Sequence, residues 1–225
     1  MDTRLLKRLN GQRVVLASKS PRRLDIVKEQ IGLDSVEVIG SGFPEDLDKD
    51  QYAPFEYVVQ TAIRKAIDVY QSEVDADEPP ALVLAADTVV VNQGLILEKP
   101  VNVEHQIAML KQLRDAPHPH RVFTGVVAIV PLEKPIAPGY AMESYLGDSK
   151  VKFRSDISDE EIEAYAKSGE ALDAAGGYKI QGGAKKFVEN VEGDVFNVIG
   201  LPVGGTIKLI ENTFRVAEDS DSESD

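Results

Sequence analysis

The stretch VVLASKSPRR, residues 14–23, places a strand signal directly before a helix signal. The apolar run 14–17 is typical of a short buried strand. Ser20 is a favourable N-cap residue and Pro21 suits the first position of a helix, so a helix is predicted to begin there. The apolar face of that helix repeats at helical spacing, at Leu24, Val27 and Ile31.

The start of this predicted helix is strongly basic. Arg22 and Arg23 lie in its first turn, and Lys19 comes just before it. Cations at a helix N-terminus oppose the helix dipole. A bound anion would reverse that effect, because backbone N–H groups, guanidinium groups and hydroxyls would converge on it. The segment therefore indicates either a phosphate-binding site or an ordinary capped helix with solvated arginines.

Composition limits the class of protein. The chain has 225 residues, of which 43% are hydrophobic and 28% are charged, as in a soluble globular protein. No run approaches the roughly 18 apolar residues that cross a bilayer, and the N-terminal segment lacks the apolar stretch of a signal peptide. Because there is no cysteine, disulfides and thiolate metal sites are excluded. The default location is the cytosol or the nucleus, of which we expect the cytoplasm, and we expect no membrane partner.

The net charge of −13 argues against a nucleic-acid partner bound through a broad basic surface. Five acidic residues fall within the last eight positions, with no basic residue among them. We therefore expect one compact domain over residues 1–216 and a disordered acidic tail over residues 217–225. The serines of this tail belong either to a solubilising segment or to substrate sites of a kinase.

Strand and helix signals alternate along the chain, which predicts an α/β fold. The further predicted strands cover residues 36–39, 81–91, 95–97, 122–130, 145–153 and 186–191. The further predicted helices cover residues 55–70, 103–113, 158–168 and 202–214. The third of these begins with a capping box formed by Ser158 and Glu161.

Two charged residues interrupt apolar segments. Asp87 lies within the strand 81–91, where a carboxylate must be paired, solvated at a cleft or bound to a cation. Ligands of open α/β sheets bind at the carboxyl ends of strands, so Asp87 is either functional or a carboxylate that caps a loop. Lys65 lies among the apolar positions of the helix 55–70, where it either has a partner or extends outward to solvent.

The loops contain further candidates. Lys99 follows the predicted hairpin and is either a phosphate ligand or an ordinary surface lysine, and Glu45 is interpreted as an exposed acid. The segment GEALDAAGGYKIQGG, residues 169–183, is dense in glycine, which lets a backbone approach a ligand closely. Within it, Gln181 offers an amide suited to the edge of a base.

Several established motifs are absent from the sequence. No GxxxxGK[ST] occurs, no GxGxxG follows a strand, and there is no HExxH or nucleophile elbow. The three histidines form no metal-ligand pattern, and His118-Pro119-His120 is predicted to be an exposed turn.

Six segments follow one another in a recognisable order. They read LASKSPRR (16–23), ADTVV (86–90), EKP (98–100), FTGV (123–126), AGGYKIQG (175–182) and VIGLP (198–202). Together they resemble the Maf family of nucleotide pyrophosphatases, and the resemblance extends over residues 14 to about 210.

This resemblance implies an inosine triphosphate pyrophosphatase-like fold, an elongated mixed sheet flanked by helices with a cleft between two lobes. It implies hydrolysis of a nucleoside triphosphate to the monophosphate and pyrophosphate, assisted by Mg²⁺ or Mn²⁺, and a homodimer. Asp87 would be the general base, and it would hold the metal together with Glu45. The implied triphosphate ligands are Ser18, Arg22, Arg23, Lys65 and Lys99.

One branch of the family prefers dTTP and UTP, and another prefers 7-methyl-GTP. This chain resembles the first branch at Arg22, Thr88 and Gln181, where the second typically carries Trp, Gln and Glu. An amide such as Gln181 pairs with the O4/N3 edge of thymine or uracil, whereas a carboxylate suits a cationic methylated guanine. We therefore expect dTTP and UTP as substrates, with CTP and modified pyrimidine nucleotides as further ones.

Three features depart from the family pattern. Ala174 replaces a common lysine, and Lys179 replaces a frequent glycine, which adds either a phosphate contact or a solvent-facing cation. The segment 131–147 is longer than a minimal hairpin, which predicts a change to the dimer surface or the cleft rim. The alternative function is a non-catalytic nucleotide-binding regulator of cell division, since the family is also named for inhibition of septum formation. Retention of Asp87 with the phosphate ligands argues against it.

Overall fold

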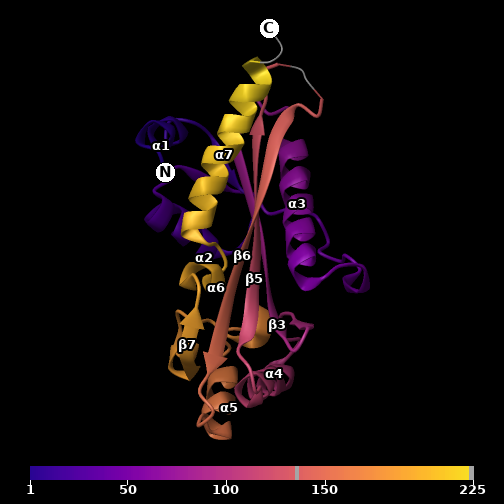
Figure 1. Cartoon of the computed structure of the whole chain (residues 1–225), viewed down its shortest axis with the longest axis vertical. Coiled ribbons are helices and arrows are strands. Elements are labelled where there is room, and N and C mark those ends of the chain that lie inside the picture. Colours follow the sequence, from indigo (N-terminus) through magenta and orange to yellow (C-terminus); the bar gives the residue numbers. More distant parts are fainter. Residues whose placement is uncertain (135–136, 223–225) are drawn as a thin grey trace.

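The computed structural model describes residues 1–134 and 137–222. Its helices and strands lie along an elongated sheet (Figure 1). In chain order the elements are α1 (Thr3–Leu9), β1 (Val14–Leu16), α2 (Pro21–Ile26), η1 (Val27–Ile31), β2 (Val36–Val38), η2 (Lys49–Gln51), α3 (Pro54–Glu73), β3 (Leu82–Asn92), β4 (Leu95–Leu97), α4 (Val103–Asp115), β5 (His120–Pro131), β6 (Tyr140–Phe153), α5 (Asp159–Lys167), η3 (Ala175–Gly177), η4 (Gly183–Phe187), β7 (Val188–Glu192), α6 (Val195–Ile199) and α7 (Val203–Ser222). No helix in these two ranges combines the length and apolar character needed to cross a bilayer.

The described strands form one seven-stranded mixed sheet in the order β2-β1-β3-β5-β6-β7, with β4 paired to β3. β1 is parallel to β2 and β3, whereas β3, β5, β6 and β7 pair in antiparallel fashion. The predicted hairpin is present, because β4 returns along the end of β3 through Gln93 and Gly94, both at positive φ. The expected fold class, an elongated mixed α/β sheet flanked by helices, is confirmed.

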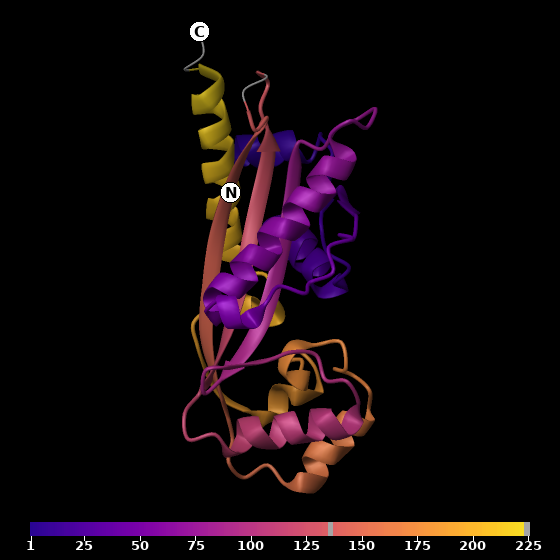
Figure 2. The ribbon, with the colours of Figure 1, turned by 90° about the vertical axis from the view of Figure 1, so that its right-hand side faces the viewer.

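The long strands β5 and β6 run through both lobes of the molecule. β6 alone covers 14 residues, which is about 46 Å at 3.3 Å per residue. In the first lobe, α1, α2 and α7 cover one face of the sheet and α3 covers the other (Figures 1 and 2). Successive residues of β3 alternate between these two cores, Leu84 facing the side of α7 and Ala85 the side of α3.

The second lobe surrounds the opposite ends of β5 and β6. There α4, α5 and η4 pack beneath the sheet (Figure 2), and their core includes the fully buried rings of Phe153 and Phe187. Because the same strands enter both cores, the two lobes share one sheet and are held on either side of a common cleft.

Gly125 of β5 lets α3 lie very close to the sheet. A Cβ atom on Gly125 would lie 2.7 Å from the carbonyl oxygen of Val58 and 2.9 Å from the Cα of Val59. Both are backbone atoms of α3, so a side chain has no room there. Gly125 also pairs with Asp87 across the β3–β5 ladder. The close approach of the helix therefore occurs beside Asp87.

The C-terminal helix is longer than predicted. α7 continues to Ser222, so the expected disorder is wrong for residues 217–222, while residues 223–225 lie outside the described part of the chain. Ala217 is buried in the first lobe. Asp221 accepts hydrogen bonds from the backbone N–H groups of Glu133 and Lys134, at 3.2 and 3.0 Å. These contacts come from a distant segment, and the composition of the tail carries no sign of them.

The segment 131–147 consists mostly of paired strand. β5 extends to Pro131 and β6 begins at Tyr140, and Glu133 and Lys134, which follow β5, contact Asp221 near the C-terminal end of α7. None of its described residues lines the main cleft. The predicted change to the cleft rim is therefore wrong, and the predicted change to a dimer surface stays a prediction.

Gly125→Ala should lower the free energy of unfolding by about 2 kcal/mol or more, because the added methyl group meets backbone atoms of α3. Gly204→Ala is the matched control. A Cβ at Gly204 in α7 meets no atom within 4 Å, so this variant should be neutral or stabilised by up to about 1 kcal/mol. Urea unfolding measures both, and equal stabilities would contradict the close approach of α3.

Candidate active site

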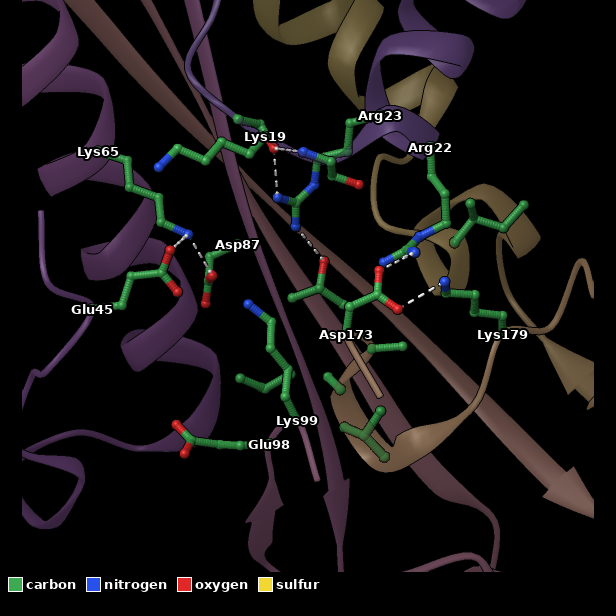
Figure 3. Close-up of a pocket in the computed structure, with 18 of the residues that line it drawn as sticks. Lys19, Arg22, Arg23, Glu45, Lys65, Asp87, Glu98, Lys99, Asp173 and Lys179 are labelled. Atoms are coloured by element: carbon green, nitrogen blue, oxygen red, sulfur yellow. Dashed lines mark hydrogen bonds and ion pairs between the residues drawn. The ribbon is translucent and has the colours of Figure 1, made fainter. Parts of the chain in front are cut away.

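A cleft of about 680 Å³ opens between the two lobes, a size typical of small-molecule sites. Charged side chains point into it from both sides (Figure 3). The β1–α2 segment, the loop before α3, α3 itself, β3, the segment after β4 and the glycine-rich loop all contribute to its walls. Every site residue predicted from the sequence lines it, namely Ser18, Arg22, Arg23, Glu45, Lys65, Asp87, Thr88, Lys99 and Gln181.

Lys65 joins two carboxylates at the centre of the cleft. Its Nζ lies 2.9 Å from Oδ1 of Asp87 and 2.7 Å from Oε1 of Glu45. Lys65 is only 7% exposed and Asp87 only 9%, so both charges depend on this pairing. The interpretation of Lys65 as a side chain that extends outward to solvent is therefore wrong. The helix α3 directs it inward to the strand β3 (Figure 3).

Glu45 is held in an unusual backbone conformation. Its φ of 55° lies in the left-handed region, which residues with a Cβ rarely adopt. Its carbonyl accepts a hydrogen bond from the Tyr57 hydroxyl at 3.3 Å. Partial burial raises the pKa of Glu45, but the Lys65 hydrogen bond and the charges of Lys65, Lys99 and Arg23 outweigh it, so the net shift is downward. Glu45 is therefore an ionised carboxylate of the cleft.

Arg23 connects several walls of the cleft. Its Nε donates to the carbonyl of Gly200 at 2.9 Å, and its terminal nitrogens donate to Oγ of Ser18 at 3.1 Å and Oγ1 of Thr88 at 3.0 Å. Burial lowers the pKa of Arg23, yet a guanidinium starts so high that it stays protonated at neutral pH. Three of its five N–H donors are used in this way, which leaves two for a ligand.

The two serines of the β1–α2 segment have different environments. Oγ of Ser18 accepts from Arg23 and from the backbone N–H of Ser20, at 3.1 and 3.2 Å. Its own hydroxyl hydrogen is therefore available to donate toward the cleft. Ser20 occupies the predicted N-cap position of α2, but its side chain makes no capping hydrogen bond. The predicted start of the helix is confirmed, whereas the prediction that the Ser20 side chain caps it is wrong.

The hydroxyl of Thr88 is engaged on both sides. It accepts from Arg23 and lies 2.9 Å from Oγ1 of Thr124, which itself donates to the carbonyl of Asn197 at 2.9 Å. Because Thr124 uses its hydrogen there, Thr88 donates to Thr124. Thr88 therefore fixes the position of Arg23, and its predicted contact with a substrate stays a prediction.

The cleft is locally positive in an acidic protein. Six cationic and four anionic side chains line it, for a formal charge of +2, whereas the whole chain carries −13. Among the described residues, Lys19 and Lys99 make no ion pair. The aliphatic stem of Lys19 lies over Gly40, where a Cβ would come within 2.2 Å of the lysine Cε. Positive charge is thus concentrated where an anion would enter.

Sequence analysis assigned no site role to several residues that line the cleft, among them Tyr57, Glu98 and Asp173. Asp173 accepts a hydrogen bond from Arg22 on the other side of the cleft and forms an ion pair with Lys179 (Figure 3). An acid in a glycine-rich loop carries no periodic signal. Its partners become visible only when the loop has folded back to α2.

The donor set of the cleft fits a hard divalent cation. Asp87 and Glu45 bring carboxylate oxygens to the same point, at Lys65. In the described part of the chain, no group of three or more His, Cys, Asp or Glu side chains has the geometry of a metal site. Mg²⁺ typically takes one or two carboxylates and completes its shell with phosphate oxygens and water, so the pair of Asp87 and Glu45 fits such an ion.

The glycine-rich loop is anchored to the second lobe by backbone hydrogen bonds. The N–H of Gly176 donates to the carbonyl of Glu98 at 3.1 Å, and the side chain of Gln106 donates to the carbonyl of Gly177 at 2.8 Å. The two glycines have φ values of 68° and 72°, where a side chain would be strained. Gln181 is therefore presented to the cleft by a fixed loop.

His120 lies in the interior, contrary to the prediction of an exposed turn. It is 1% exposed in β5, whereas His118 is exposed as predicted. Its Nε2 lies 2.8 Å from the hydroxyl of Tyr178, a residue of the glycine-rich loop that also lines the cleft. Burial, together with the charge of Lys152, lowers the pKa of His120 to about 3. The neutral imidazole therefore helps to hold the loop.

Comparison with known proteins identifies relatives over most of the chain. The sequence model of the family described as Maf-like protein matches residues 13–213. The dTTP/UTP pyrophosphatase of Schizosaccharomyces pombe is 45% identical over 216 residues, which cover 96% of this chain and 89% of that protein. The human "probable bifunctional dTTP/UTP pyrophosphatase/methyltransferase protein" is 41% identical over 92% of this chain and 33% of that protein. The solved structure of a HAM1 protein from Coxiella burnetii covers 92% of this chain and 99% of that chain, at 15% identity and a TM-score of 0.39.

His120 should make the protein less stable as the pH falls from about 6.5 toward 3. In that window the unfolded chain binds a proton at a histidine pKa near 6.5, whereas the folded chain binds it only near about 3. The unfolded state therefore gains stability, by about 2 kcal/mol between pH 7 and pH 5. His120→Gln removes this titration, so the stability advantage of the wild type over the variant should shrink by that amount.

Urea unfolding at pH 7 and pH 5 measures the change, and acids elsewhere cancel in the difference between wild type and variant. His118→Gln is the control, because His118 is exposed and should show a much smaller change. A difference between wild type and His120→Gln that does not depend on pH would show that His120 titrates normally.

Proposed function

The chain belongs to the family of Maf-like proteins, and we propose that it is a nucleoside triphosphate pyrophosphatase that hydrolyses dTTP and UTP. The products are the nucleoside monophosphate and pyrophosphate, and CTP and modified pyrimidine nucleotides are proposed as further substrates. The observation that carries this proposal is the buried Lys65, which joins the carboxylates of Asp87 and Glu45 in a positively charged cleft. The homodimer implied by the family and the cytoplasmic location expected from the composition stay predictions.

Asp87 is proposed as the general base. Lys65 holds its Oδ1, so the second carboxylate oxygen is the one that accepts a proton. A water oxygen attacks the α-phosphorus, and the proton of that water passes to Asp87. The bond from the α-phosphorus to the oxygen shared with the β-phosphorus breaks, and pyrophosphate leaves with that oxygen. No covalent enzyme intermediate is required.

The cations of the cleft are proposed to bind the triphosphate and stabilise the charge that develops on the bridging oxygen. Arg22 and Lys99 present cationic groups to the cleft (Figure 3), and Arg23 keeps two free N–H donors. Ser18 contributes the hydroxyl hydrogen that its neighbours leave available. Because Arg23 is fixed by three hydrogen bonds, little reorganisation is needed at the moment of reaction.

Asp87 and Glu45 are proposed to hold the Mg²⁺ or Mn²⁺ that the family implies. Such an ion neutralises phosphate charge and polarises the phosphoryl oxygens. Lys65 keeps the two carboxylates close together and ionised, and the ion would be held through the oxygen lone pairs that Lys65 leaves free. The net downward shift in the pKa of Glu45 supports this role.

Gln181 is proposed to read the pyrimidine base. It is exposed on the cleft wall, on the loop anchored through Gly176 and Gly177. Its amide can donate to O4 and accept from N3–H of thymine or uracil, and when turned by 180° it can accept from the N4 amino group of cytosine and donate to N3.

Asp87→Asn should lower turnover of dTTP and UTP by at least about 10³-fold, because asparagine cannot accept the proton. Wild type and variant would be incubated with Mg²⁺ and dTTP, UTP, CTP or 7-methyl-GTP, and pyrophosphate would be separated from phosphate. Asp34→Asn, which changes an exposed aspartate outside the cleft, is the matched control. Excess chelator should abolish the wild-type reaction.

The reaction products distinguish a pyrophosphatase from a non-catalytic nucleotide-binding regulator. Monophosphate and pyrophosphate from dTTP and UTP, lost in Asp87→Asn alone, are the expected result. Nucleotide binding by the wild type without turnover of any substrate would favour the non-catalytic regulator.

Gln181→Glu should lower kcat/KM for dTTP and UTP about tenfold, because the carboxylate loses the donor to O4 and faces that oxygen with a negative charge. Gln71→Glu adds the same charge on the exposed surface of α3 and should leave kcat/KM unchanged. Steady-state kinetics with both nucleotides checks this. Equal effects of the two variants would exclude base reading by Gln181.

A further inference from the structure

One ion-pair network crosses the cleft and takes no part in the chemistry at Asp87. The carboxylate of Asp173 accepts from Nη1 of Arg22 at 3.2 Å and pairs with Nζ of Lys179 at 2.8 Å. Arg22 lies on α2 in the first lobe, whereas Asp173 and Lys179 lie on the glycine-rich loop of the second (Figure 3). One acid therefore holds together two cations from opposite walls.

The position of Lys179 is set by its neighbours. Tyr178 and Ile180 are buried in the core of the second lobe, and the backbone N–H of Lys179 donates to the hydroxyl of Tyr165 at 3.0 Å. The side chain of Lys179 lines the cleft, next to its neighbours Tyr178 and Ile180. Its side chain is 20% exposed, so the charge is partly shielded but still reachable.

Asp173 is the weakly held member of the network. Its side chain is 61% exposed, whereas the side chains of Arg22 and Lys179 are only 21% and 20% exposed. Partial burial raises the pKa of Asp173, but Lys179 and Arg22 outweigh it and lower the pKa, so the group is an anion at neutral pH. A guanidinium and an ammonium that converge on a carboxylate are also the groups that bind phosphate.

We propose that Arg22 and Lys179 form an anion site in which the carboxylate of Asp173 competes with a phosphate group of the nucleotide. Lys179 is then a substrate-binding residue in addition to those named above, and Asp173 is an internal competitor that a phosphate displaces from both cations. This inference rests on the proposed function, because it takes a nucleotide as the ligand of the cleft.

Competition predicts that removing the charge of Lys179 and removing the charge of Asp173 have opposite effects on phosphate binding. Removing the charge of Lys179 removes a phosphate ligand and weakens binding. Removing the charge of Asp173 removes the competitor and strengthens binding. If Asp173 served only to hold Arg22 in place, its removal would instead weaken binding, so the sign of the effect separates the two roles.

The test measures binding of inorganic pyrophosphate to the full chain by calorimetry, with thymidine as a probe that lacks phosphate. Lys179→Met should weaken pyrophosphate binding about five- to tenfold, as expected for loss of one charge-assisted hydrogen bond at a partly exposed site. Asp173→Asn should tighten it about threefold or more, with thymidine binding unchanged in both. Lys185→Met removes an exposed lysine a few residues away, outside the cleft, and should change the dissociation constant less than twofold.

Several results would overturn the proposal. They are weaker pyrophosphate binding by Asp173→Asn, equal binding by Lys179→Met and Lys185→Met, or an effect of Lys179→Met on thymidine alone. Thermal melting confirms that each variant is folded. Binding of pyrophosphate does not require turnover, so failure of dTTP hydrolysis would reject the proposed function and leave this test intact.

Discussion

A carboxylate in the middle of a buried strand must be compensated, and much of this structure depends on how that is done for Asp87. Lys65 supplies the compensating charge from α3, and its Nζ bonds to Asp87 at 2.9 Å. The helix reaches the sheet closely because Gly125, the ladder partner of Asp87, has no side chain. An aspartate in β3, a glycine in β5 and a lysine in α3 are therefore one physical unit, since each would be unfavourable without the others.

The same lysine also brings the loop before α3 into the cleft. Glu45 bonds to Lys65 from a strained backbone position, so two carboxylates that would repel each other share one cation. On the opposite wall, Arg23 connects the β1–α2 segment, β3 and the turn after α6 through hydrogen bonds to Ser18, Thr88 and Gly200. The reactive groups are thus placed by fixed hydrogen bonds, which favours preorganised electrostatic stabilisation.

The two-lobed shape explains how an acidic protein offers a site to a polyanion. The long strands enter both cores, so the lobes face each other across a cleft whose lining is positive. The end of α7 is one place where acidic residues gather. The glycine-rich loop is anchored to the second lobe through Gly176, Gly177 and Tyr178, and from there it carries Lys179 and Gln181 to the ligand side.

By itself the sequence determined the alternation of strands and helices, the strand-to-helix junction at 14–23 and the residues gathered in the cleft. The alternation and the junction follow from local spacing, which depends on neighbours in the chain, whereas the cleft residues follow from the six segments that resemble the Maf family. Only the tertiary structure decided that His120 is buried against Tyr178, that α7 continues through Ala217 to Ser222, and that Asp173 meets Arg22. Each of these rests on contacts between segments far apart in sequence, and the pattern around a single residue does not encode which distant group will cover it.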